Sequence, residues 1–167
     1  MQNRPNKLQI GLVLGSTFLL MALDQLSKLW IRDNFAVGES WPESGILRIT
    51  HVTNTGASFG LFSNQSTILA ILSITIVISI IVTIRYLTRI TNLCMVASGL
   101  VIGGAVGNLI DRLRLGYITD FINFRLWGDV HWPVFNIADS AIVVGTILLA
   151  ISLFLSSIRE KQHDKCS

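Results

Sequence analysis

The sequence contains few charged residues. Asp, Glu, Lys and Arg make up 14% of its 167 residues, against about 25% in an ordinary soluble domain, whereas 51% of the residues are hydrophobic and the mean hydropathy is +0.60. With three prolines, 13 scattered glycines and no block of like charges, the chain has neither the composition of a disordered protein nor that of collagen. The low charge disfavours a soluble globule, and the length leaves room for one domain.

Cysteine is scarce as well. Cys94 and Cys166 supply neither a disulfide framework nor a CxxC metal site, so we expect a buried thiol at the first position and a free thiol in the tail at the second. The net charge is +3 and the isoelectric point is near 9.2. No cluster of Lys and Arg accompanies this excess, so nucleic acid is not an expected partner.

The sequence contains four long hydrophobic runs with few or no charged residues. Three of them cover Leu61–Ile84, Ile90–Ile110 and Ser140–Ile158, and a fourth runs from Leu8 to about Ile31, interrupted by Asp24 and Lys28. A helix of about 20 residues spans the hydrocarbon core of a membrane. The sequence therefore predicts a single membrane-embedded domain over residues 1–167, with four transmembrane helices at about 8–31, 64–84, 90–112 and 139–158.

The charges indicate how these helices are oriented. Four spans place both termini on one side of the membrane, which carries seven Lys or Arg residues and two acidic residues. The other side carries six Lys or Arg residues and eight acidic residues. The positive-inside rule then makes the termini cytoplasmic and turns two long loops, 32–60 and 113–138, outward. All four tryptophans fall in or beside these loops, as expected for a membrane interface. The first span is too long for a signal peptide and lacks a small-x-small cleavage site, so we expect it to be retained.

Both outer loops contain strand-like segments. Ile46–Thr53 and Tyr117–Phe124 are rich in branched residues with partial alternation, which predicts short strands. The expected fold class is thus an all-α membrane protein with a small extracytoplasmic β-rich cradle. At 1.5 Å of rise per residue, one layer near the outer end of the helices collects Asp24, Lys28, Asn108, Asp111, Arg112, Asp120, Asn136 and Asp139. Ionisable residues at that depth are costly unless they line a wet or paired cavity, so each is a candidate site residue.

Several of these residues also have a structural interpretation. Asp24 and Lys28 lie four residues apart and can form an ion pair at a helix end, with Lys28 snorkelling outward. The polar residues of 108–112 follow the small-residue run 103–107, which permits close helix packing, and they can simply end that helix.

Asp120 is harder to explain structurally. It lies in the largely apolar stretch 116–124 with no adjacent basic residue, whereas Asn136 and Asp139 can serve as the N-cap and third residue of a helix. Asp139 is a candidate partner for Asp120, because both belong to the same layer. Two carboxyls held close together do not both ionise easily, so one keeps a proton while the other acts as a base toward water. An aspartic protease needs such a pair.

Other chemistries fit less well. The three histidines show no metal-ligand spacing, so no metal or cofactor is expected. Ser58, in the run 55–60, lacks the context of a nucleophile turn, although an intramembrane serine protease that uses it stays an alternative. The run 103–107 is not followed by Lys-Ser/Thr and is no phosphate loop.

Five blocks of the sequence together resemble the bacterial lipoprotein signal peptidases, also called signal peptidase II. In the family's order they are Asp24–Lys28, Asn54–Phe59, Gly103–Arg112, Thr119–Ile122 and Phe135–Asp139. The resemblance covers nearly the whole chain and is specific because the blocks occur together. It implies an aspartic endopeptidase of the bacterial cytoplasmic membrane, without metal or cofactor. Its substrate is a prolipoprotein, cut just before a cysteine that carries a diacylglyceryl thioether.

The resemblance also implies roles for individual residues. Asp120 and Asp139 match the catalytic pair. The polar residues that line the site and orient the substrate are matched by Asn54, Asn108, Arg112 and Asn136. Structural or accessory roles are expected for Asp24, Lys28, Gly56, Gly104 and Asp111. We further expect a monomer surrounded by membrane lipid, with its active site near the outer face.

The main competing class is a non-enzyme, such as a small transporter subunit or a membrane scaffold whose interfacial charges bind an ion or a partner helix. Two features count against it. The polar layer lies near one membrane face and not at the midplane, and the two halves of the sequence show no inverted repeat. The tail 159–167 has no role that the sequence assigns.

Overall fold

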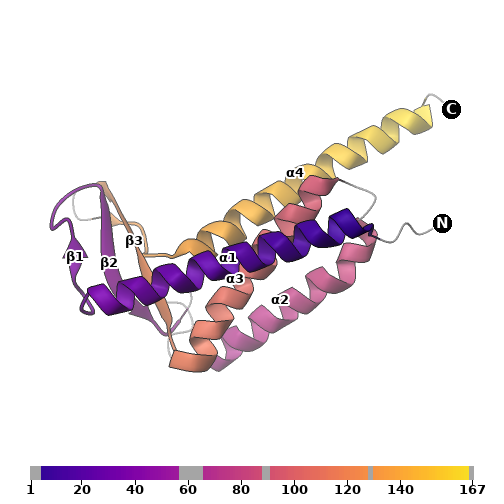
Figure 1. The fold of residues 1–167 in the computed structure, drawn as a ribbon. Coiled ribbons are helices and arrows are strands. Elements are labelled where there is room, and N and C mark those ends of the chain that lie inside the picture. The colour runs from indigo at the N-terminus through magenta and orange to yellow at the C-terminus, as the bar shows by residue number, and fades with distance from the viewer. Residues whose placement is uncertain (1–4, 57–65, 88–90, 128–129, 166–167) are drawn as a thin grey trace.

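The structure is a computed structural model that describes residues 5–56, 66–87, 91–127 and 130–165. Within these residues, four long helices form an elongated bundle and a small sheet lies at one end of it (Figure 1). The helices are α1 (Lys7–Asn34), α2 (Ser66–Leu87), α3 (Asn92–Leu115) and α4 (Ile137–Lys165). The first turn of α1 and the last turn of α4 both lie at the end away from the sheet, as four spans predict.

All four helices are long and apolar enough to cross a membrane, which confirms the predicted fold class. They begin and end within a few residues of the predicted spans, except that α4 continues to Lys165. Local capping sets two of the ends. The side chain of Asn6 accepts a hydrogen bond from the backbone N of Gln9 at 2.8 Å at the start of α1. Gly116, with a φ of 81°, ends α3 in the left-handed conformation that glycine adopts easily.

The sheet consists of β1 (Ser40–Trp41), β2 (Leu47–Asn54), β3 (Ile118–Trp127) and β4 (Val130–His131), paired antiparallel in that order. The strands predicted in both loops are therefore confirmed. In the long β2/β3 pair, Val52 lies opposite Asp120 and Asn54 lies opposite Ile118. Because side chains two residues apart share a face, Asn54 and Asp120 are diagonal neighbours on one face of the sheet.

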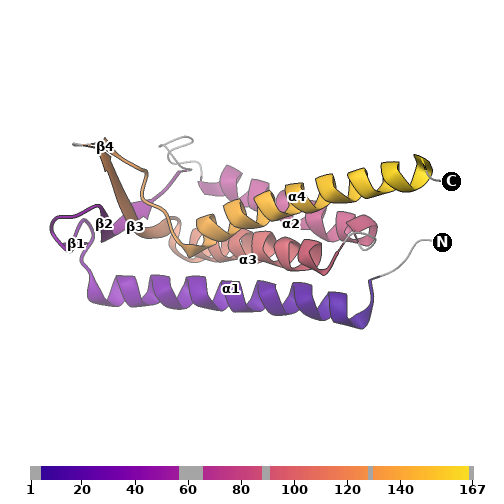
Figure 2. The same ribbon diagram turned by 90° about the horizontal axis from the view of Figure 1, so that it is seen from above.

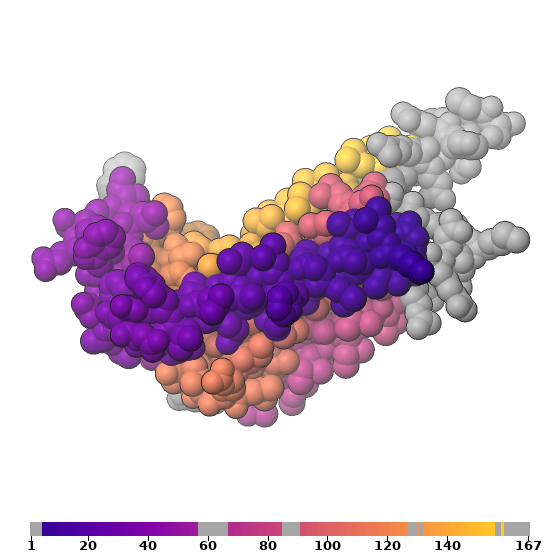
Figure 3. Space-filling view, viewed as in Figure 1, coloured from indigo at the N-terminus to yellow at the C-terminus, as the bar shows by residue number. Residues whose placement is uncertain are grey.

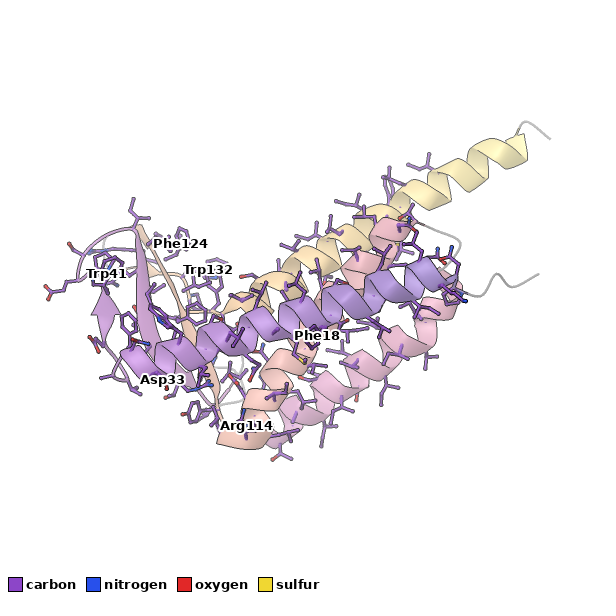
Figure 4. The ribbon with its side chains drawn as sticks, viewed as in Figure 1. Phe18, Asp33, Trp41, Arg114, Phe124 and Trp132 are labelled. Carbon is purple, nitrogen blue, oxygen red and sulfur yellow. The ribbon has the colours of Figure 1, made fainter. Side chains whose placement is uncertain are left out.

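Helix α3 is the centre of the bundle. It packs against each of the other three helices, and Figure 2 shows it between α1 on one side and α2 and α4 on the other. In its most apolar stretch 67% of the residues are buried, against 22% or fewer in the other helices. Those helices expose large apolar side chains such as Phe18 on α1 (Figure 4). Exposed apolar surface of this extent indicates contact with lipid.

Glycines allow α3 to approach its neighbours closely. A Cβ at Gly104 would lie 2.5 Å from the backbone O of Ala138 on α4, and one at Gly107 would lie 2.5 Å from Oδ2 of Asp24 on α1. Only residues without a side chain fit such contacts. The packing role predicted for the small-residue run is therefore confirmed. These contacts bring Asp24 and the start of α4 to the level of the polar end of α3.

Candidate active site

Lys28 is the centre of a buried ionic cluster between α1 and α3. Its Nζ lies 2.8 Å from Oδ2 of Asp24 and 3.2 Å from Oδ2 of Asp111, and it donates a hydrogen bond to Oδ1 of Asn108 at 2.8 Å. The predicted ion pair with Asp24 is confirmed. The expectation that Lys28 snorkels outward is wrong, because the side chain is fully buried. Three acceptors satisfy the three N–H groups of its ammonium, so it has no need of water.

The carboxylates of this cluster join four elements. Oδ1 of Asp24, on α1, accepts a hydrogen bond from the backbone N of Ala138 in the first turn of α4 at 3.0 Å. Oδ2 of Asp111, on α3, accepts one from the backbone N of Thr119 on β3 at 3.1 Å. Hydrogen bonds between charged and neutral groups are stronger than those between neutral groups. The cluster therefore holds the start of α4 and the start of β3 in place.

Three polar residues that sequence reasoning missed complete the cluster: Gln25, Arg32 and Thr119. Nε2 of Gln25 donates to Oδ2 of Asp24 and to Oδ1 of Asp111, each at 3.2 Å. Nη1 of Arg32 donates to Oγ1 of Thr119 at 3.0 Å. The signal that could have found them is polarity in an apolar setting, since Gln25 and Arg32 follow Asp24 on the same helix and Thr119 precedes Asp120.

Two asparagines connect the cluster to the carboxyl pair. Oδ1 of Asn108 accepts from Lys28 and also from Nδ2 of Asn136 at 3.2 Å, so the Nδ2 of Asn108 faces Asp139 and donates to its Oδ1 at 2.8 Å. Oδ1 of Asn136 accepts from the backbone N of Asp139 at 2.9 Å, and its Nδ2, besides bonding Asn108, donates to Oδ1 of Asp120 at 2.7 Å. Each amide has one accepting and one donating end. The donors at the oxygen ends therefore fix which way both amides point.

Asn54 is oriented by the same principle. Its Oδ1 accepts a hydrogen bond from the backbone N of Gly56 at 3.0 Å, and its Nδ2 donates to Oδ2 of Asp120 at 2.9 Å. The β2/β3 register places the two side chains on one face of the sheet. The N–H group of Gly56, a residue for which the resemblance implies an accessory role, thus helps to aim the Asn54 amide at the carboxyl.

Asp120 and Asp139 are held by one residue between them. Asn136 contacts Asp120 through its side chain and donates its backbone N–H to Oδ2 of Asp139 at 3.2 Å. Together with the hydrogen bond from the backbone N of Asp139 to Oδ1 of Asn136, this contact forms the helix cap predicted for Asn136 and Asp139. Asp120 is 2% exposed, and Asp139 is half-buried.

The two carboxyls differ in their environment. Burial, and then the negative charge of Asp139, raise the pKa of Asp120 to about 7, although hydrogen bonds from Asn54 and Asn136 and the charge of Lys28 act in the opposite direction. Asp120 therefore keeps its proton up to about neutral pH. The pair can then supply one acid and one base.

A cavity of about 190 Å³ opens beside Asp139. Its polar end is formed by Asn54, Asn108 and Arg112, and its apolar walls come from α2, α3 and α4. Arg112 interacts electrostatically with both Asp139 and Asp120. Within the described residues, no group of three His, Cys, Asp or Glu side chains is arranged to hold a metal ion. Ser58, the alternative nucleophile, lies outside those residues, as does Cys166, whereas Cys94 is a buried free thiol as predicted.

This arrangement is that of a multi-pass membrane protein with two interacting carboxyls next to a cavity at one end of its helical bundle. Residues 16–155 match the family model described as signal peptidase (SPase) II. The chain belongs to the signal peptidase II family, which confirms the resemblance found in the sequence.

Individual relatives agree with this assignment. The lipoprotein signal peptidase of Moorella thermoacetica is 45% identical over 138 residues, which cover 82% of this chain and 89% of the relative. The lipoprotein signal peptidase of Dehalococcoides mccartyi is 43% identical over 146 residues, which cover 85% of this chain and 88% of the relative. A solved bacterial membrane enzyme superposes with a TM-score of 0.77 at 31% identity, covering 94% of each chain. The protein is thus a peptidase of a bacterial membrane.

Proposed function

We propose that this protein is an aspartic endopeptidase that removes the signal peptide from prolipoproteins by cutting before the diacylglyceryl-modified cysteine. The observation that carries the proposal is the pair Asp120 and Asp139, held through Asn136 at the edge of a cavity. Membership of the signal peptidase II family, with relatives named lipoprotein signal peptidase, supports a lipoprotein precursor as the substrate. The raised pKa of Asp120 supports a pair that shares one proton at neutral pH.

In the proposed mechanism, the two aspartates have different roles. The carboxylate of Asp139 takes a proton from a water molecule, whose oxygen attacks the carbonyl carbon of the scissile bond. The protonated Asp120 donates a hydrogen bond to the carbonyl oxygen and stabilises the charge that develops there. When the tetrahedral intermediate collapses, Asp139 passes its proton to the amine of the departing cysteine. Arg112 lies near both carboxyls and limits the build-up of negative charge.

The position of the site suits a substrate that never leaves the membrane. We place the sheet and the site on the outer side, because the opposite end of the bundle carries the excess of Lys and Arg. A prolipoprotein is anchored there by its signal helix and by two acyl chains. An active site at this interface reaches the scissile bond without extracting the lipid, and the surrounding helices and sheet limit access of bulk water.

The direct test is cleavage of a diacylglyceryl-modified prolipoprotein by the purified protein in detergent, with a metal chelator present. We expect cleavage just before the modified cysteine, and slow or no cleavage of the same precursor with an unmodified cysteine. Mass spectrometry of the released signal peptide locates the cut. Absence of cleavage by folded protein would favour the binding or transport alternative, and loss of activity on adding the chelator would contradict a metal-free mechanism.

The raised pKa of Asp120 predicts how the rate depends on pH. We expect kcat/KM to fall as the pH rises above about 7, because Asp120 then loses the proton that it donates. Asn54→Ala removes a hydrogen bond that lowers the pKa of Asp120, so the alkaline limb should move to higher pH. Asp139, Lys28 and Arg112, the charged groups around Asp120, are unchanged in this variant.

The control for this pH shift is Asn34→Ala, which removes an exposed asparagine at the end of α1, away from the carboxyl pair. Its pH profile should match that of the wild type. An alkaline limb that stays in place or moves to lower pH in Asn54→Ala would contradict the role given to Asp120.

A further inference from the structure

Asp139 borders two cavities. The first is the cavity of about 190 Å³ lined by α2, α3 and α4. The second, of about 360 Å³, lies between the first turns of α4 and the segment 132–135 that precedes them. Among the described residues, Asp139 is the only one that lines both. The reacting carboxyl therefore lies where two separate spaces meet.

The second cavity is an apolar groove that opens toward lipid. Besides Asp139 it is lined by Trp132, Pro133, Phe135, Ser140, Val143 and Val144. Val143 and Val144 are 57% and 49% exposed on a membrane-spanning helix, so this side of the groove faces the hydrocarbon. The hydroxyl of Ser140 is bonded to the backbone O of Asn136 at 3.0 Å. The groove thus offers hydrocarbon contacts and little that could bind a peptide backbone.

The wall opposite α4 is fixed to the sheet. Phe135 exchanges backbone hydrogen bonds with Ile122 at 3.1 and 2.7 Å, and Trp132 donates its backbone N–H to Phe124 at 2.8 Å. Figure 3 shows a hollow between the sheet and the start of α4. Figure 4 places the side chains of Trp132 and Phe124 on the side of the sheet that faces it. Because its wall is anchored in this way, the groove is a formed feature of the fold.

We propose that this groove, lined by 132–135 and the first turns of α4, holds the acyl chains of the diacylglyceryl group. The proposal rests on the proposed function. In the substrate, the scissile bond separates the signal helix from the modified cysteine, so two apolar branches leave the reacting carbonyl in different directions. The cavity beside α2 and α3 has a polar end for a peptide backbone, and the groove is apolar. Each branch then occupies the space whose chemistry matches it.

A first experiment locates the acyl chains directly. A prolipoprotein that carries a photoreactive diazirine in one acyl chain is bound to the Asp120→Asn protein, which is expected to retain uncleaved substrate, and is then irradiated. Peptide mapping should find the label within 132–144. Label confined to α1 or α2 would overturn the proposal. Because crosslinking requires binding and no cleavage, it reports on the groove independently of the catalytic assignment.

A second experiment fills the groove. Val143→Trp should raise KM about tenfold for a substrate with long acyl chains, since it excludes roughly two methylene groups from the groove. KM for a substrate with two-carbon acyl chains should stay unchanged, as should kcat for both. The matched control is Ile147→Trp, one helical turn further along α4 and 53% exposed, which lines neither cavity and should alter no constant.

These measurements separate the two proposals. Equal KM values for Val143→Trp and the wild type on the long-chain substrate would overturn the acyl-chain groove while leaving the peptidase intact. Failure of the wild type to cleave any prolipoprotein would overturn the proposed function, and the position of the crosslink would still decide whether acyl chains occupy the groove.

Discussion

Replacing Asp139 with asparagine is expected to abolish cleavage while the protein stays folded in the membrane. Asparagine has the shape of aspartate, and its Oδ1 can still accept a hydrogen bond from Asn136 or Asn108, so the start of α4 keeps a cap. An amide cannot take a proton from water. Because a positioned acid or base contributes about 10²–10⁴-fold to a rate, we expect kcat to fall by at least about 10³-fold.

Asp120→Asn should have an effect of similar size for a different reason. The amide still fills the space between Asn54 and Asn136, but it has no acidic proton to stabilise the tetrahedral intermediate. Steady-state cleavage of a diacylglyceryl-modified precursor measures both losses. Thermal unfolding in detergent should place the two variants within a few degrees of the wild type, which separates lost chemistry from lost structure.

The control for this carboxyl pair is Asp33→Asn. Asp33 is an exposed carboxylate at the sheet end of α1 (Figure 4), so the same chemical change there should leave kcat unchanged. Ser58→Ala should also remain active, because the proposed mechanism has no serine nucleophile. Full activity of either Asp120→Asn or Asp139→Asn would remove the pair from the mechanism, and an inactive Ser58→Ala variant would revive the serine protease.

Replacing Lys28 with methionine is expected to cause the largest loss of stability. The variant keeps the length of the side chain but removes the cation that lies between the buried carboxylates of Asp24 and Asp111, so that Asp111 keeps only the more distant Nη1 of Arg32 at 3.9 Å. Removing one partner of a buried ion pair costs about 3–5 kcal/mol, and more than one pair is broken here. We expect little folded protein in the membrane, measured as the monodisperse fraction after extraction and as the unfolding temperature.

Lys28→Met should also affect the chemistry of whatever protein remains folded. Without Lys28, Oδ1 of Asn108 loses one of its donors, so the amide is less firmly held toward Asp139 and kcat should fall with little change in KM. The control is Arg114→Met, which removes an exposed cation at the end of α3 (Figure 4) and should alter neither quantity. An unfolding temperature for Lys28→Met equal to that of the wild type would contradict the structural role of the cluster.

Much of the fold could be predicted from particular stretches of the chain. The run Leu61–Ile84 predicts a span because an uncharged segment of that length has no other stable place than a membrane or a core. Branched residues in Ile46–Thr53 predict a strand because their alternation matches a pleated surface. Asp120 stood out because a carboxylate in an apolar strand needs an explanation. Each of these inferences uses a property of one segment alone.

The environment of Lys28 could not be predicted from its own segment of the sequence. Its sequence spacing allows an ion pair with Asp24, but spacing does not show whether the lysine reaches solvent or is enclosed. The enclosing acceptors come from Asp111 and Asn108, about 80 residues away. Gln25 was missed for the same reason, because two of its acceptors, the backbone O of Gly107 and Oδ1 of Asp111, lie on α3.

The amino-acid sequence was enough to predict four membrane spans, strands in two loops and a layer of polar residues near one end, because hydropathy, alternation and length are properties of contiguous segments. Which of these polar residues contact one another depends on how the helices and strands pack. The close approach of α3 to α1 and α4 at Gly107 and Gly104, together with the β2/β3 register, aims the asparagine amides at Asp120 and Asp139. That packing also places Asp139 between two cavities, since contacts between distant segments depend on how whole elements fit together.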